Sequence, residues 1–96
     1  MWDIDQIIII KNGESTGEAS VKLIDEEKTA LFLNKIQIDL SSGANAIGIA
    51  KVAGTPVISG GAVDAIKEEI LEVFQNDLRD AEPGMYRVDI NGVVSI

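Results

Sequence analysis

The sequence predicts an α+β fold in which one amphipathic helix lies across a mostly antiparallel curved sheet or partial barrel. Isoleucine is unusually frequent, and β-branched side chains favour strands. Only one stretch, after residue 60, has the periodicity of a long amphipathic helix. The chain has 96 residues, so we expect one domain spanning residues 1–96, with elements in the order ββββαββ.

Four strands are predicted before the helix, at residues 3–11, 19–24, 30–40 and 45–53. In the first, residues 7–10 are four consecutive isoleucines, which indicates burial on both faces. In the third, the apolar phase changes between Leu31 and the pair Ile36 and Ile38. A bulge near Asn34-Lys35 would bring them onto one face, because one extra residue reverses the alternation of a strand.

The helix is defined by apolar residues that recur on one side, namely Val63, Ile66, Ile70, Val73, Phe74 and Leu78. Pro83 and Gly84 are predicted to end it. Asp77 falls inside the apolar sector of the helical wheel. It must therefore be paired if it is buried, unless the helix turns it outward by that point.

Two short strands around Asn91-Gly92 complete the fold as a hairpin. A small sheet of this kind has exposed edges. We expect those edges to be the isoleucine-rich first strand and the "VVSI" segment at residues 93–96.

Charge and composition exclude several classes of function. The net charge is −8 and no Lys/Arg cluster exists, which argues against direct binding to nucleic acid or to an anionic membrane. Without Cys or His, the commonest zinc ligands and the commonest general base are missing. We expect no metal, no cofactor and no catalytic residues, and a cytoplasmic protein without a signal peptide.

Ser59, Gly60 and Gly61 stand where an apolar run meets the helix. Free backbone N–H groups at such a helix N-terminus can hold a phosphate or carboxylate. No phosphate-binding motif is present, however, and Asp64 would repel an anion. The alternative is that Ser59 or a glycine only caps the helix.

Asp64, Glu68 and Glu72 repeat every four residues and form an acidic row along the helix. The row suits a solvated face, a docking surface for a basic partner, or carboxylates that imitate the phosphates of a nucleic acid. Asp25, Glu26 and Glu27 could offer oxygens to a hard cation, but they match no calcium-loop motif, and a charged turn is the favoured interpretation.

These observations favour a small non-catalytic interaction or assembly module. It would self-associate as a homo-oligomer through strand edges, or dock another protein through the acidic helix face. One alternative is a binder of a small anionic ligand, such as a phosphate or nucleotide, at Ser59-Gly60-Gly61. A lower-ranked alternative is an inhibitor or nucleic-acid mimic of the accessory or phage type. An enzyme would require the carboxylates of Asp39, Asp77 and Asp89 to converge.

Overall fold

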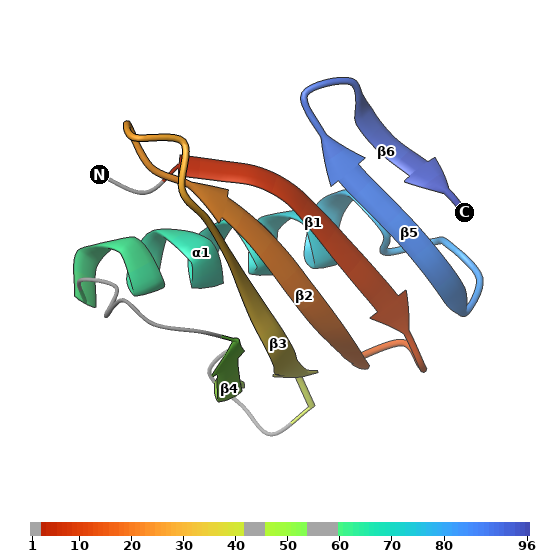
Figure 1. Ribbon diagram of the computed structural model, residues 1–96. Helices are drawn as coiled ribbons and strands as arrows, with labels where there is room; N and C mark the ends of the chain where they lie inside the picture. The colour runs from red at the N-terminus through yellow and green to blue at the C-terminus, as the bar shows by residue number, and fades with distance from the viewer. Residues whose placement is uncertain (1–2, 42–45, 54–59) are drawn as a thin grey trace.

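The computed structural model describes residues 3–41, 46–53 and 60–96. It confirms the predicted order ββββαββ: four strands, one helix and a final pair of strands (Figure 1). The elements are β1 (Asp3–Lys11), β2 (Thr16–Ile24), β3 (Ala30–Asp39), β4 (Ala46–Ala53), α1 (Gly60–Glu72), β5 (Gly84–Asp89) and β6 (Gly92–Ser95). A π-helical turn at Val73–Asp77 extends α1.

The strands form one open sheet in the order β4-β3-β2-β1-β5-β6, and every described pair is antiparallel. The sheet is open, in agreement with the predicted α+β fold of a curved antiparallel sheet and one helix, and its edges are β4 and β6. The predicted edge at the "VVSI" segment is therefore confirmed, whereas the predicted edge at β1 is wrong. After α1 the chain returns as β5 on the free side of β1, and β1 becomes a central strand (Figure 1).

The predicted bulge in β3 is confirmed by the strand register. Ala19 is opposite Ile36 and Val21 is opposite Leu33, so Asn34 and Lys35 together stand opposite the single residue Ser20. This insertion returns the apolar positions of β3 to one phase. Leu31, Ile36 and Ile38 consequently all belong to the core.

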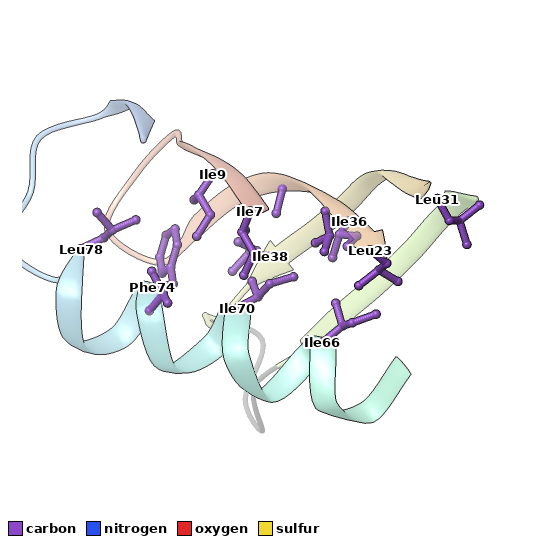
Figure 2. Packing of buried hydrophobic residues seen from close by; sticks show 13 residues of the cluster. Ile7, Ile9, Leu23, Leu31, Ile36, Ile38, Ile66, Ile70, Phe74 and Leu78 are labelled. Carbon is purple, nitrogen blue, oxygen red and sulfur yellow. The ribbon is translucent and has the colours of Figure 1, made fainter. Parts of the chain in front are cut away.

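The core lies between α1 and one face of the sheet (Figure 2). Ile7 and Ile9 are buried there, while Ile8 and Ile10 on the opposite face are only half-buried. The expectation that both faces of β1 are buried is therefore wrong. One helix covers one face of a sheet, and no other described element covers the second.

Gly17 belongs to β2, which begins at Thr16 rather than at the predicted residue 19, and its role is steric. A Cβ atom at this position would lie 2.5 Å from the backbone oxygen of Ile10 and 3.0 Å from the Phe74 ring. The absence of a side chain lets the largest core residue of the helix pack directly on the sheet.

The π turn explains why Asp77 is exposed although the helical wheel places it inside. The backbone N–H of Leu78 donates to the carbonyl of Val73, five residues back, at 3.0 Å. This wider turn puts Leu78 into the core beyond Phe74 and rotates Asp77 toward solvent. Of the two alternatives for Asp77, the outward one holds.

Candidate interaction surface

The glycines of the predicted anion site are the first residues of α1, as the sequence indicates. Ser59 lies outside the described residues, so the proposed set Ser59-Gly60-Gly61 is only partly visible. The backbone arrangement suits both a helix start and an anion site, and the ligand-binding role stays a prediction.

The acidic row is exposed along its whole length. Asp64, Glu68 and Glu72 all have solvent-accessible side chains on the side of α1 that faces away from the sheet. A solvated face and a docking surface both require this exposure. The docking role therefore stays a prediction as well.

The acidic segment at residues 25–27 is a turn held by its own backbone. The Asp25 carboxylate accepts hydrogen bonds from the N–H groups of Glu27, at 3.0 Å, and Thr29, at 2.9 Å. Within residues 3–41, 46–53 and 60–96, no group of three or more acidic side chains is arranged to hold a metal ion. The charged-turn interpretation thus accounts for Asp25 without a cation.

The three carboxylates that an enzyme would need to converge are dispersed. Asp39 ends β3, where it accepts hydrogen bonds from Ser41, while Asp89 ends β5 near the opposite end of the sheet. Asp77 lies on the helix. The three carboxylates therefore lie on different elements and do not form one cluster.

Tyr86 and Arg87 likewise point to opposite faces of β5, as neighbouring strand residues must. Tyr86 packs against the core and its hydroxyl donates to the carbonyl of Glu82. Arg87 lies on the open face, with its Nε 3.3 Å from the Asp89 carboxylate. They do not line a common pocket.

Lys11 is a buried cation that the sequence reasoning missed. The residue is 4% exposed, and its Nζ donates to the carbonyls of Leu78 (2.7 Å), Arg79 (3.2 Å) and Ala81 (2.7 Å). These carbonyls follow the last turn of the helix, where backbone acceptors lack helical partners. Lys11 therefore caps the helix from the adjacent strand, which is a structural role.

The edge strand β6 presents backbone groups that its neighbour does not use. The N–H of Ile96 donates to the carbonyl of Met85 at 3.0 Å, which identifies that pair as hydrogen-bonded. Hydrogen-bonded pairs alternate along an antiparallel ladder, so the next one is Val94 with Arg87. The N–H and C=O groups of Val93 and Ser95 consequently point away from β5, toward the open edge of the sheet.

Exposed apolar side chains gather on the open face around this edge. Val94 is 41% exposed, Ile96 55% and Met85 42%. Ile96 lies opposite Met85, and Val94 lies opposite Arg87, two residues further along β5. The three apolar side chains are therefore on the same side of the sheet. Residues 92–96 contain no charged side chain, although the chain carries a net charge of −8. β6 lies at one edge of the sheet (Figure 1). Among the described residues, this edge thus combines exposed apolar side chains, no charged side chain, and backbone donors and acceptors that β5 does not use.

Comparison with known proteins adds no family assignment. No protein-family model matches the chain, and neither a curated protein nor a solved structure matches it. Among the described residues, no helix has both the length and the apolar character needed to cross a membrane.

Proposed function

We propose that this chain is a non-catalytic interaction module that assembles by accepting an additional strand at β6. The observation that carries the proposal is that β6 is an edge strand that no described element covers. Proteins usually block an exposed edge with lysine, proline, a bulge or a covering element. The segment at residues 92–96 has neither proline nor a charged side chain, and its partly exposed Val94 and Ile96 flank the outward backbone groups.

The other edge, β4, is less suited to strand addition. Its sequence includes Lys51, and a lysine on an edge strand discourages pairing because its charge would have to be desolvated. A shared sheet across β6 leaves the acidic row of α1 free in solvent, where it maintains repulsion between copies at any other contact. The absence of cysteine agrees with a reducing, cytoplasmic environment, which we include in the proposal.

The test is the oligomeric state of Ser95→Pro compared with the natural sequence. The Ser95 N–H points outward, so proline removes a donor for the incoming strand while every hydrogen bond from β5 to β6 remains. Sedimentation velocity over a concentration series should show self-association for the natural chain. Ser95→Pro should weaken that association about tenfold or more, because each copy loses one of its two outward N–H donors and keeps only that of Val93.

Ser95→Ala is the matched control, since it removes the hydroxyl but keeps the backbone N–H. It should associate like the natural chain, and circular dichroism should show the same fold for all three proteins. A natural chain that sediments at the 10.3 kDa chain mass at every concentration would refute self-assembly. So would a Ser95→Pro variant that associates unchanged.

A further inference from the structure

The backbone geometry of β6 restricts which strand can pair with it and in which register. Val93 and Ser95 each direct one N–H and one C=O outward, and they are separated by Val94, whose own groups bond to Arg87 of β5. An incoming antiparallel strand must offer the same spacing, with two outward residues separated by one that faces its own sheet. β6 of a second copy offers this spacing.

We infer that the strand added to β6 is β6 of a second copy, antiparallel, about a two-fold axis that passes beside Val94. This inference rests on the proposed function and specifies its partner. With Val94 opposite Val94 of the second copy, each Val93 lies opposite the other copy's Ser95. All outward N–H and C=O groups of both residues are then used, in four hydrogen bonds.

Other registers use these groups less completely. A slip of one residue places outward groups opposite residues that bond to their own β5. A slip of two residues that puts Val93 on the axis places Ser95 opposite Asn91, which lies in the hairpin loop. The N–H of Asn91 already donates to the Asp89 carboxylate at 2.8 Å.

The side chains fit the same register. Val94 lies opposite Val94 of the second copy in a non-hydrogen-bonded pair. In such pairs the facing side chains come closest. Ile96 falls opposite Gly92 of the second copy, and a Cβ atom built on Gly92 has no atom within 4 Å. The exposed Ile96 side chain therefore covers a position that has space for it. On the adjacent strand β5, Arg87 and Asp89 form an ion pair within one chain.

The interface is short. Four residues of β6 from each copy are few compared with the roughly 20–30 residues per side of a standard interface. We therefore expect a weak, reversible dimer with a dissociation constant on the order of micromolar or weaker.

The absence of cysteine makes single-cysteine crosslinking a direct test of the register. Val94→Cys places two thiols on the axis, where facing Cα atoms lie about 4.5 Å apart, within disulfide range. In Ser95→Cys, each cysteine lies opposite Val93 of the other copy, so the two cysteines are offset by two residues along the paired strands. Their Cα atoms are then about 8 Å apart, which is too far for a disulfide. Ile90→Cys, 98% exposed at the hairpin tip, reports random collision.

After mild oxidation with glutathione disulfide, we expect a disulfide-linked dimer of Val94→Cys in at least about tenfold excess over the other two variants. If the natural chain dimerises but Ser95→Cys or Ile90→Cys crosslinks as readily as Val94→Cys, the register is wrong while the proposed function stands. If sedimentation shows only single chains, both the register and the proposed function fail.

Discussion

Lys11 lies on the buried face of β1 and donates hydrogen bonds to carbonyl groups at the end of the helix that have no helical partner. It follows Ile7 and Ile9 on the buried face, so its ammonium group cannot reach bulk water directly. The ammonium group instead donates its hydrogen bonds to the carbonyls of Leu78, Arg79 and Ala81. Such an arrangement stabilises the fold only while the donor and all acceptors are present.

Lys11→Met should therefore destabilise the protein by about 1–3 kcal/mol, because three carbonyls lose their shared donor. Lys22→Met is the matched control: Lys22 forms an exposed ion pair with Asp5 at 3.5 Å, and losing such a pair costs about 0–1 kcal/mol. Urea denaturation of both variants measures the difference. Equal losses of stability would contradict the capping role.

The sequence contained a signal for Lys11 that pattern reasoning did not use. A lysine two positions after Ile9 in a strand must share the buried face with it, and a buried lysine requires acceptors. The identity of those acceptors could not be predicted. They lie 67 to 70 residues away along the chain, and only the packing of the helix end against β1 brings them close.

At the scale of the elements, the π turn decides which side chain of the last helical turn enters the core. Leu78 is buried and Asp77 is exposed, although regular α-helical periodicity would place both on the apolar side. The wider turn removes the conflict between a carboxylate and the core without requiring a cationic partner.

Leu78→Ala should consequently cost about 2–5 kcal/mol of unfolding free energy, the usual range for truncating a buried leucine. Asp77→Ala should change it by no more than about 0.5 kcal/mol, as at an ordinary surface position. Thermal or urea unfolding of the two single variants compares them directly. A large loss for Asp77→Ala would show that the carboxylate has a structural partner after all.

The sequence predicts the positions of those elements that depend on neighbouring residues alone, such as a bulge or a tight turn. The phase change between Leu31 and Ile36 predicts the β3 bulge, and Asn91-Gly92 predicts the hairpin. The hairpin loop itself is Ile90–Asn91, one residue earlier than expected, because Gly92 opens β6 with a φ of +105°. The neighbours of β1 were not predictable, since the alternation of side chains describes the two faces of a strand and not the strands beside it.

At the scale of the whole molecule, a charge of −8 opposes any association between copies. The proposed contact adds little to this repulsion locally because residues 92–96 have no charged side chain, but the remaining surface still repels. The sequence predicts only part of the candidate surface, because the direction of the backbone groups depends on strand pairing. The sequence identified "VVSI" as an edge, but its outward groups at Val93 and Ser95 depend on the pairing of β6 with β5.

Raising the ionic strength should therefore strengthen self-association. Between about 0.01 M and 1 M salt the screening length falls from about 30 Å to about 3 Å, which removes most of the repulsion. Sedimentation equilibrium should show a dissociation constant that decreases with salt. A constant that increases with salt would indicate that attraction between opposite charges, rather than strand pairing, holds the copies together.

The central position of β1 has a consequence for synthesis on the ribosome. β1 is made before β5, its second partner, which begins only at Gly84, after the helix. Until then a nascent chain carries an isoleucine-rich strand with one side unpaired, a template for the wrong neighbour. Neighbouring nascent chains on one polysome can therefore pair through their β1 strands until β5 has been synthesised. Pairing of β5 with β1 then closes this site.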